Sequence, residues 1–252
     1  MCTSLNEFNT IDTISIREKF NELPNVTFLS FANVDYKNSM ERLTRQASGL
    51  PFDNMLLYNE HDLKKIDEFW DRHGTFIEKN KRGYGYWLWK PYLVLRTLRN
   101  MKDGDILLYS DSGASINPDI EQFKEMIKRV STTPSGIVSW ELPHFEKTFT
   151  KMDLVYHLQA ESIIENNIKQ LHATFFLLRC SESVKKVVEK WYETASNYQL
   201  LDDTASKIQN DASFIEHRHD QSIFSILRRI HGTDIIYYYN DGGILRDTKT
   251  RG

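Results

Sequence analysis

Residues 106–113 read Ile-Leu-Leu-Tyr-Ser-Asp-Ser-Gly, an apolar run that stops at a polar turn containing Asp111. A short run of this kind, bounded by turn residues, is typical of a buried strand. Comparable runs lie at residues 26–32, 54–58, 137–140, 173–178 and 235–239. Helical periodicity fills the intervals, and strands that alternate with helices predict an α/β fold with a mostly parallel central sheet flanked by helices.

The expected helices are marked by apolar stripes and by residues that suit helix ends. Pro91 suits the first turn of a helix, and Ser181 suits an N-cap position. We expect helices over residues 38–46, 61–72, 118–130 and 181–195, one that opens at Pro91, and a last one that carries Ile223 to Ile230. No repeat, low-complexity tract or linker interrupts the chain. We therefore predict a single domain over residues 1–252, with roughly the first 20 residues as a loosely packed extension.

Composition limits the partners that this chain can have. Of its 252 residues, 40% are hydrophobic and 27% are charged, which is ordinary for a folded globular protein. Lys and Arg number 32 against 35 Asp and Glu, so the net charge is −3 and no basic field favours a nucleic acid. Cys2 and Cys180 are too few for a disulfide framework and form no CxxC metal spacing. A small molecule or a glycan is the expected substrate.

The beginning of the chain and its apolar runs bear on location. Residues 1–19 are polar and acidic and lack the apolar core of a signal peptide. The longest apolar runs have the length of strands, well short of the roughly 20 residues that span a bilayer. The sequence therefore predicts a soluble, cytoplasmic protein with no membrane span.

The polar turn after residues 106–110 is the first candidate site. In open α/β sheets, ligands bind beyond the carboxyl ends of the strands. Asp111 at such an end is suited to bind Mg²⁺ or Mn²⁺ and so to bridge the sheet to a diphosphate. Ser112 and Gly113 follow, and glycine lets the backbone approach a ligand closely. The alternative interpretation is a polar turn that merely closes a strand.

The second candidate site is the block from Arg82 to Pro91, which reads Arg-Gly-Tyr-Gly-Tyr-Trp-Leu-Trp-Lys-Pro. Aromatic faces such as that of Trp87 stack on bases or sugar rings, and Arg82 and Lys90 are suited to neutralise phosphate. A buried aromatic wedge with Lys90 on the surface is the alternative. Because a core needs neither the glycines nor the cations, we favour a binding role for the block.

The third candidate site is the run from Glu216 to Ser222, which reads Glu-His-Arg-His-Asp-Gln-Ser and precedes a helical pattern. Asp220 is either the N-cap of that helix or a functional carboxylate beside Gln221. A basic run at a helix N-terminus opposes the helix dipole, which favours the functional interpretation. Two further residues are candidates near strand ends, Glu141 as a base for an acceptor hydroxyl and His172 in the cleft. A solvated acid and a structural histidine are their alternatives.

Taken together, four segments resemble a family of GT-A-type glycosyltransferases found in bacteria and in large DNA viruses, including the small glycosyltransferase domains of algal chloroviruses. The resemblance runs in order over most of the chain. The matching segments are Ser30 to Asn33, Gly83 to Trp87 with Lys90-Pro91, Gly104 to Tyr109, and His217 to Ser222. It implies a Rossmann-like sheet, a nucleotide-diphosphate-sugar, with uridine as the expected base, and a divalent metal.

The resemblance also implies roles for individual residues. Ala32, Asn33 and Tyr36 correspond to the positions that hold the base and the ribose. Asp111 stands at the metal-binding Asp-x-Asp motif, although here Asp-Ser-Gly lacks the second carboxylate. Asp220-Gln221 is similar to the Asp-Gln pair beside the anomeric carbon in several retaining enzymes, so the resemblance favours retention.

The sequence therefore predicts a metal-dependent glycosyltransferase that moves a sugar from a nucleotide-diphosphate-sugar to a glycan hydroxyl. Lys90 and the metal would stabilise the departing diphosphate, because charge develops there in the transition state. One alternative is a glycoside hydrolase that uses Asp111 and Asp220 as paired carboxylates. The other is a catalytically silent module that binds a carbohydrate or a nucleotide.

Overall fold

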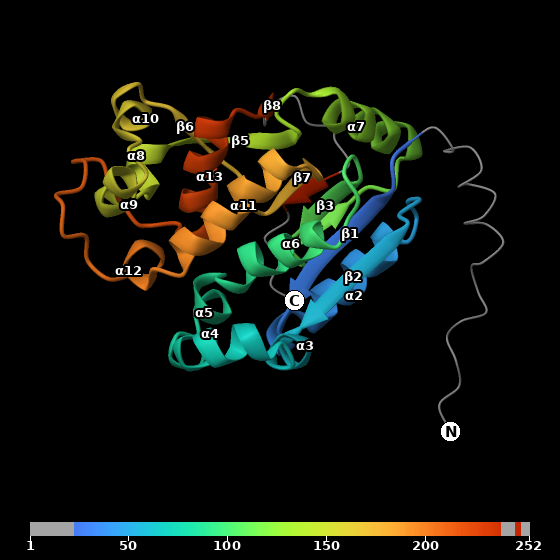
Figure 1. Cartoon of the computed structure of the whole chain (residues 1–252), viewed down its shortest axis with the longest axis horizontal. Coiled ribbons are helices and arrows are strands. Elements are labelled where there is room, and N and C mark those ends of the chain that lie inside the picture. The colour runs from blue at the N-terminus through green and yellow to red at the C-terminus, as the bar shows by residue number, and fades with distance from the viewer. Residues whose placement is uncertain (1–22, 238–244, 248–252) are drawn as a thin grey trace.

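The computed structural model describes residues 23–237 and 245–247 (Figure 1). The strands are β1 (Val26–Ala32), β2 (Asn54–Asn59), β3 (Ile106–Ser110), β4 (Ala114–Ile116), β5 (Ile137–Phe145), β6 (Lys169–Leu171), β7 (Phe175–Arg179), β8 (Asp234–Tyr237) and β9 (Leu245–Asp247). The helices are η1 (Val34–Tyr36), α2 (Lys37–Ala47), α3 (Glu60–Lys64), α4 (Asp67–Lys79), α5 (Gly83–Tyr86), α6 (Trp89–Arg99), α7 (Ile120–Thr132), α8 (Glu146–Phe149), α9 (Met152–His157), α10 (Glu161–Glu165), α11 (Glu182–Ala195), α12 (Tyr198–Leu201) and α13 (His219–His231).

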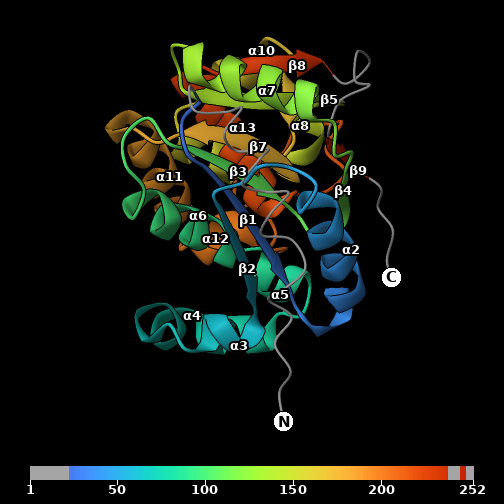
Figure 2. The ribbon, with the colours of Figure 1, turned by 90° about the vertical axis from the view of Figure 1, so that its right-hand side faces the viewer.

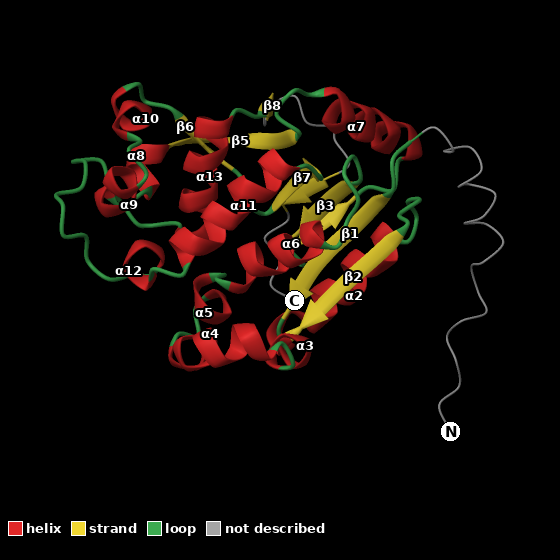
Figure 3. Ribbon diagram, in the orientation of Figure 1, coloured by secondary structure: helices red, strands yellow, loops and turns green. Residues whose placement is uncertain are grey.

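Seven of these strands form the central sheet, in the order β2-β1-β3-β7-β5-β6, with β8 paired to β5. Strand β1 is parallel to β2 and β3, and β5 is parallel to β8. Strand β7 is antiparallel to β3 and β5, and β6 is antiparallel to β5, so these two strands run against the other five. Helices and strands alternate along the chain (Figure 3). The predicted α/β fold with a mostly parallel sheet is confirmed.

Helices cover both faces of the sheet because alternate residues of a buried strand point to opposite sides. Leu29 and Phe31 of β1 belong to one core cluster, which also contains residues of α6, α11 and α13. Val26 and Phe28 of the same strand belong to a second cluster with residues of α2 and α7. Figure 2 shows α6 and α11 on one side of the sheet and α2 on the other.

Several predicted elements differ from the observed ones. The helix predicted over 61–72 is two helices, α3 and α4, which are separated at Lys65 and Ile66. At the break, the N–H groups of Lys65 and Ile66 bond back only three residues, and the backbone of Ile66, with φ −95° and ψ 86°, is not helical. The apolar stripe does not reveal this change. The helix predicted to open at Pro91 begins at Trp89, and the one predicted over 118–130 begins after the Asp119 cap.

Part of the prediction lies outside the described residues. This applies to the N-terminal extension, to Cys2 and to residues 238–239 of the last predicted strand. A bilayer-spanning helix, long and apolar enough to cross, is not found in the part of the chain that the structure describes.

Strand pairing determines where the functional residues meet. Leu29 of β1 lies beside Tyr109 of β3 in a parallel pair, so these two strands end at the same edge of the sheet. Ser110 of β3 is paired with Phe175 of β7, which runs the other way. The residues just before β7 therefore lie beside the residues just after β3. This edge combines a polar turn with an irregular segment, 172–174, between β6 and β7.

Candidate active site

The ammonium group of Lys90, near the start of α6, connects three segments of the chain. Its Nζ lies 3.0 Å from Asp111 Oδ1, 3.1 Å from Asp220 Oδ2 and 3.2 Å from the carbonyl oxygen of Ala173, to which it donates. The side chain is only 2% exposed. Burial alone would lower the pKa of Lys90, but the two carboxylates outweigh it and raise this pKa. Lys90 is therefore a buried cation that joins the end of β3 to the start of α13.

The two carboxylates on Lys90 have different surroundings. Asp111 is 26% exposed, and its Oδ1 also accepts a hydrogen bond of 2.5 Å from the hydroxyl of Tyr109. Burial and the neighbouring Asp111 raise the pKa of Tyr109, so that hydroxyl stays protonated and donates. Asp220 is 5% exposed. Burial raises its pKa to about 6, with Asp111 adding to the effect and Lys90 opposing it.

The irregular segment 172–174 holds these groups together, and each of its backbone polar groups has a partner. The N–H groups of His172, Ala173 and Thr174 donate to Trp140 O, Gln221 Oε1 and His172 Nδ1, respectively. The three carbonyl oxygens accept, in the same order, from Arg228 Nη2, Lys90 Nζ and the Asp111 N–H. Because buried backbone groups are costly to leave unpaired, these partners fix the path of the segment.

The glycine- and aromatic-rich block forms a left-handed turn beside Lys90. Five consecutive residues, Gly83 through Trp87, have φ between 53° and 84°. Left-handed backbone costs about 1–2 kcal/mol for each residue other than glycine, and three of the five are aromatic. At Gly85, a Cβ atom would also lie 2.6 Å from the side chain of Ile77. Glycine is thus required at this point, and strain of this kind is typical of functional sites.

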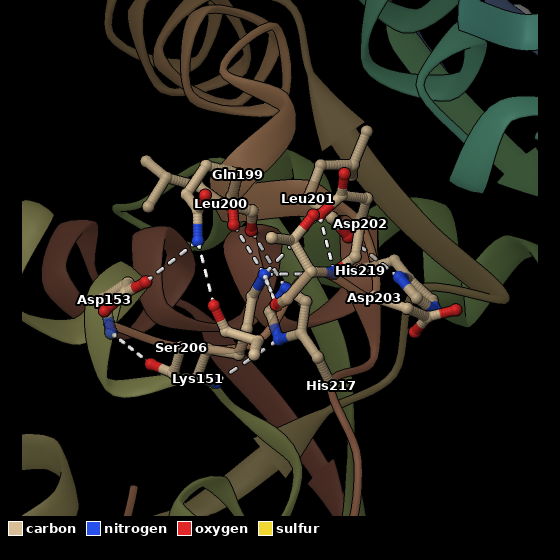
Figure 4. A network of polar contacts seen from close by, with 12 residues as sticks. Lys151, Asp153, Gln199, Leu200, Leu201, Asp202, Asp203, Ser206, His217 and His219 are labelled. Atoms are coloured by element: carbon tan, nitrogen blue, oxygen red, sulfur yellow. Dashed lines mark hydrogen bonds and ion pairs between the residues drawn. The ribbon is translucent and has the colours of Figure 1, made fainter. Parts of the chain in front are cut away.

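His219, the first residue of α13, packs against this turn. Its ring is stacked on Trp87 with centroids 5.6 Å apart and contacts Tyr86 at 4.7 Å. Its Nδ1 lies 2.8 Å from the carbonyl oxygen of Leu201 and donates to it, while the neighbouring His217 donates from Nε2 to Leu200 O. Figure 4 shows the two imidazoles held within this network. Burial lowers the pKa of both histidines, so they are neutral and structural in this arrangement.

These segments enclose a cavity of about 300 Å³. Its lining comes from α5, α6, the end of β3, β5, the segment 172–174 and the start of α13. The lining residues are Arg82, Trp87, Lys90, Asp111, Leu142, His144, His172, Ala173, Thr174, Glu216, Arg218, His219, Asp220 and Gln221. Three carboxylates and three cations thus face one small space, which suits a polar ligand that carries both hydroxyl groups and charge.

Seven of the predicted site residues line this cavity, namely Arg82, Trp87, Lys90, Asp111, His172, Asp220 and Gln221. They come from four separate parts of the sequence, so the structure brings together the three blocks identified above. Arg82 also forms ion pairs of 3.2 Å with Asp203 and Glu216 at the rim.

Two details of the α13 start differ from the sequence interpretation. The helix begins at His219, and the residue before it is Arg218, so Asp220 is not the N-cap. The amide of Gln221 is engaged within the protein, because its Oε1 accepts from Ala173 N–H and its Nε2 donates to Gln170 Oε1 at 2.7 Å. Gln221 therefore lines the cavity with an amide whose orientation is already set.

The other predicted site residues do not line the cavity. Ala32 is buried at the end of β1, and Asn33 donates from its side chain to Asp35. Ser112 and Gly113 follow Asp111, and their carbonyl oxygens accept from Arg42. Tyr36, at the end of η1, is half-buried. Ala32 ends β1 and the other four residues follow β1 or β3, whose carboxyl ends share one edge of the sheet.

Glu141 is separate from the other candidates. Its carboxylate accepts a hydrogen bond of 2.7 Å from Arg229 on α13 and is 15% exposed. It points to the flank of the sheet where β5 pairs with β6. The structure thus pairs Glu141 with a cation and does not bring it to the cavity.

Sequence reasoning missed a group of buried polar residues behind the cavity. Arg228 is fully buried and holds the carbonyl oxygen of His172 at 2.7 Å. Glu146 and Gln170 are also fully buried and are hydrogen-bonded to each other at 3.1 Å. In the sequence, each of these residues stands alone among apolar or exposed neighbours, so no motif marks it. The one signal that could have found any of them is the periodicity of α13, which places Arg228 on the buried face of that helix.

The environment of Asp111 suits a divalent cation that is shared with a diphosphate. Within residues 23–237 and 245–247, no cluster of three or more His, Cys, Asp or Glu side chains is arranged to hold a metal. Mg²⁺ is commonly bound through one or two carboxylates, with substrate phosphates and waters completing the shell. The exposed part of the Asp111 carboxylate, facing the cavity, fits that arrangement. A metal held here would take its remaining ligands from a bound diphosphate and from water.

Comparison with known proteins gives neighbours among solved structures only. Neither a protein-family model nor a curated protein matches the chain. Mouse xyloside xylosyltransferase 1 is similar, with 10% identity, a TM-score of 0.44, and coverage of 85% of this chain and 84% of that one. A glycosyltransferase involved in the glycosylation of the major capsid of PBCV-1 has 9% identity and a TM-score of 0.44, over 90% and 96% of the two chains.

A third similar structure is the glycosyltransferase GlyE of Streptococcus pneumoniae, with 11% identity and a TM-score of 0.40. The similarity covers 84% of this chain and 45% of GlyE. All three are glycosyltransferases, the class that the sequence motifs resemble. Since the TM-scores stay below 0.5, the functional case rests on the residues of the cavity.

Proposed function

We propose that this chain is a glycosyltransferase that moves a sugar from a nucleotide-diphosphate-sugar, expected to be UDP-linked, to a hydroxyl group of a glycan. The observation that carries the proposal is the buried ammonium of Lys90 between Asp111 and Asp220 at the wall of the cavity. The site lies at the carboxyl end of β3, where ligands of open α/β sheets bind. Both the fixed cation and the carboxylates are groups that sugar transfer requires.

We assign Lys90 to the leaving-group side, where it would act through its charge and not through a direct hydrogen bond, because its three N–H donors are already directed to Asp111, Asp220 and the carbonyl oxygen of Ala173. When the bond between the sugar and the diphosphate breaks, negative charge grows on the diphosphate, and a preorganised cation stabilises it. The pKa of Lys90 is raised by its two carboxylates, so it keeps its charge across the neutral range. A Mn²⁺ or Mg²⁺ ion held by Asp111 would, when bound with the diphosphate, neutralise further charge on the leaving group.

Asp220 is placed on the sugar side of the same site. It is held by Lys90 and is set at the start of α13, so its position does not depend on a loop. Its carboxylate is suited to stabilise positive charge that develops at the anomeric carbon. Retention of configuration is the expected stereochemical outcome, on the basis of the Asp-Gln resemblance.

The acceptor hydroxyl is expected to enter on the side of the cavity lined by Leu142, His144 and His172. His172 is 2% exposed, and its Nδ1 accepts from the N–H of Thr174, so the orientation of its ring is fixed. Glu141, which does not line the cavity, is better placed to hold Arg229 than to act as a base.

A glycoside hydrolase is less well supported by this geometry. Asp111 Oδ1 and Asp220 Oδ2 lie 3.0 Å and 3.1 Å from Lys90 Nζ, so the distance between the two oxygens cannot exceed the sum of these values. A distance in that range also occurs between the paired carboxylates of glycosidases. In those enzymes, however, the anomeric carbon must lie between the two carboxylates. Here the ammonium of Lys90 lies between them, which favours a reaction in which a diphosphate departs.

The test is a screen of nucleotide-sugars for release of nucleotide diphosphate, with and without Mn²⁺, on the intact chain. The proposal expects release from at least one uridine-linked sugar, stimulated by an oligosaccharide acceptor and reduced at least about 100-fold in Lys90→Met. Hydrolysis of a glycoside without any nucleotide would favour the hydrolase. Binding of sugar or nucleotide without release under any condition would favour the silent module.

A further inference from the structure

A fully buried carboxylate, Glu146 at the start of α8, lies behind the candidate active site and is not part of it. It is 0% exposed. Its Oε1 accepts from the hydroxyl of Ser225, and its Oε2 accepts from Thr150 Oγ1 at 2.9 Å and from Gln170 Nε2 at 3.1 Å. A buried carboxylate without such donors would be strongly unfavourable, so these three contacts determine how it can be oriented.

Gln170 connects this carboxylate to the start of α13. The side-chain NH₂ of Gln170 faces Glu146 and also lies 3.3 Å from Ser222 Oγ, while its Oε1 faces the other way. Burial raises the pKa of Glu146, and the hydrogen bonds from Ser225, Gln170 and Thr150 oppose that rise. The Oε1 of Gln170 accepts from Gln221 Nε2 at 2.7 Å. The Oε1 of Gln221 is then left to accept from the N–H of Ala173, at 3.2 Å.

The direction of this series is fixed at both ends. At one end stands Glu146, whose Oε2 accepts from Gln170, and at the other stands the N–H of Ala173, which can only donate. If either Gln170 or Gln221 turned its amide over, a donor would face a donor or an acceptor would face an acceptor within the buried interior. Glu146 and the Ala173 N–H therefore impose the same orientation on both amides. We call Glu146, Gln170 and Gln221 the glutamine relay.

The relay ends on the peptide segment that holds the catalytic cation. Ala173 is bound at both its polar groups, with its N–H donating to Gln221 and its carbonyl oxygen accepting from Lys90 Nζ at 3.2 Å. The same ammonium contacts both Asp111 and Asp220. A shift of Ala173 therefore changes the position of Lys90 relative to the two carboxylates.

We propose that Glu146 is a positioning residue that fixes the ammonium of Lys90 by orienting Gln170, Gln221 and the Ala173 peptide. This inference rests on the proposed function for its kinetic consequence, but not for its structural one. It assigns Gln221 a supporting role, since both polar atoms of its amide are bonded inside the protein. Misplacement of reacting groups by about 1 Å can reduce a rate by roughly 100-fold, so the relay affects turnover more than binding.

Two matched variants test the relay. Gln170→Leu and Thr150→Val each remove one donor from the same oxygen of Glu146, but only Gln170 continues to Gln221. We expect similar falls in melting temperature for the two variants. Gln170→Leu alone should lower kcat by about 10-fold to 100-fold, with KM for the nucleotide-sugar within about threefold. Thr150→Val should keep kcat within about threefold of the parent.

A charge exchange gives an independent check. Gln170→Glu places two carboxylates 3.1 Å apart in the interior and should strongly reduce both stability and turnover. In the double variant Glu146→Gln with Gln170→Glu, residue 146 becomes the donor, and residue 170 still accepts from Gln221. We expect the double variant to restore kcat to within about fivefold of the parent, a large positive coupling.

Amide hydrogen exchange at Ala173 provides a readout that does not depend on activity. The relay expects faster exchange at Ala173 in Gln170→Leu and unchanged exchange in Thr150→Val. Equal exchange in both variants, or equal loss of kcat in both, would overturn the relay. If the parent protein transfers no sugar at all, the proposed function fails, while the Ala173 measurement still decides whether the relay exists.

Discussion

Asp111 and Asp220 both contact Lys90, but they lie in regions that differ in exposure to solvent. Asp111 follows β3, is 26% exposed, and has neighbours that are polar turn residues. Asp220 lies in the first turn of α13, is 5% exposed, and is surrounded by a buried polar network. An exposed carboxylate can accept a cation from solvent at low cost, whereas a buried one needs a partner that is already in place.

This difference in exposure suggests that the two sides of the site have different roles. Under the proposed function, the β3 side would receive the charged part of the substrate, because its partly exposed carboxylate can exchange ligands with water. The α13 side would contact the reacting sugar. Lys90 joins the two regions, so a variant at Lys90 affects both, and variants at the two carboxylates should affect different measurements.

The largest effect is expected for Lys90→Met, which leaves two carboxylates without their cation. We expect a loss of turnover of at least about 100-fold, because the leaving group loses its fixed charge. The free energy of unfolding should fall by about 3–5 kcal/mol, since breaking a buried ion pair leaves uncompensated charge. Urea unfolding and nucleotide release on one sample measure both. If both quantities stayed near the parent values, the role given to Lys90 would be incorrect.

Asp111→Asn should come next and should affect binding as well as turnover. The change keeps the shape and removes the charge that attracts a hard cation. Stimulation of nucleotide binding by Mn²⁺ should be lost, and turnover should fall by about 100-fold. Because Asp111 is an ion-pair partner of the buried Lys90, the melting temperature should also fall, although less than in Lys90→Met, where both carboxylates lose their cation. Transfer at the parent rate in Asp111→Asn would place the metal elsewhere.

Asp220→Ser should separate the two regions most clearly. Turnover should fall by about 100-fold, while affinity for nucleotide diphosphate stays within about threefold, since the lost interaction forms chiefly in the transition state. Asp220 is not the N-cap of α13, so loss of a cap would not explain the result. An equal loss of affinity and turnover would assign Asp220 to the same function as Asp111.

The pH dependence follows from the same residue. Burial raises the pKa of Asp220 to about 6, so kcat should rise with pH across that value as the carboxylate ionises. The contribution to stability has the opposite sign. The carboxyl group binds its proton more tightly in the folded state than in the unfolded one. The free energy of unfolding therefore falls as the pH rises from the ordinary pKa near 4 to about 6. Asp220→Asn should remove both trends, and an unchanged acidic limb would mean that another group titrates.

The smallest effect is expected for Glu141→Gln, which lies outside the cavity. Its ion pair with Arg229 is mostly buried, but glutamine can still accept a hydrogen bond from Arg229, so a modest loss of stability, of about 1–2 kcal/mol, should follow. Turnover should stay within about twofold of the parent. A drop of 10-fold or more would restore Glu141 as a candidate base and would extend the site along β5.

Much of the fold was predictable because it depends on local patterns. Apolar runs with abrupt polar ends marked β1, β3 and β7, and helical spacing marked α11 and α13. The break between α3 and α4 was not predictable, since neither proline nor glycine occurs there and the apolar stripe continues through the non-helical Ile66. The reversed direction of β7 is likewise a tertiary property that no local pattern encodes.

The site was predictable where residues cluster in sequence and not where they meet only in space. Lys90, Asp111 and Asp220 each stand in a short block with unusual composition. The contacts of Lys90 with Asp111 and Ala173 depend on the pairing of β3 with β7, which brings the segment before β7 beside Asp111. Glu146 and Gln170 are isolated polar residues, and their relation to Gln221 appears only when α8, β6 and α13 are packed together.

The most direct measurement is a calorimetric titration of uridine diphosphate into the protein, with and without Mn²⁺, for the parent, Lys90→Met and Asp220→Ser. The site described here predicts that uridine diphosphate and Mn²⁺ bind tightly only together, that Lys90→Met weakens this binding by at least about 10-fold, and that Asp220→Ser leaves it nearly unchanged. Absence of binding at millimolar uridine or guanosine diphosphate, with or without metal, would contradict the assignment of this cavity to a nucleotide-sugar.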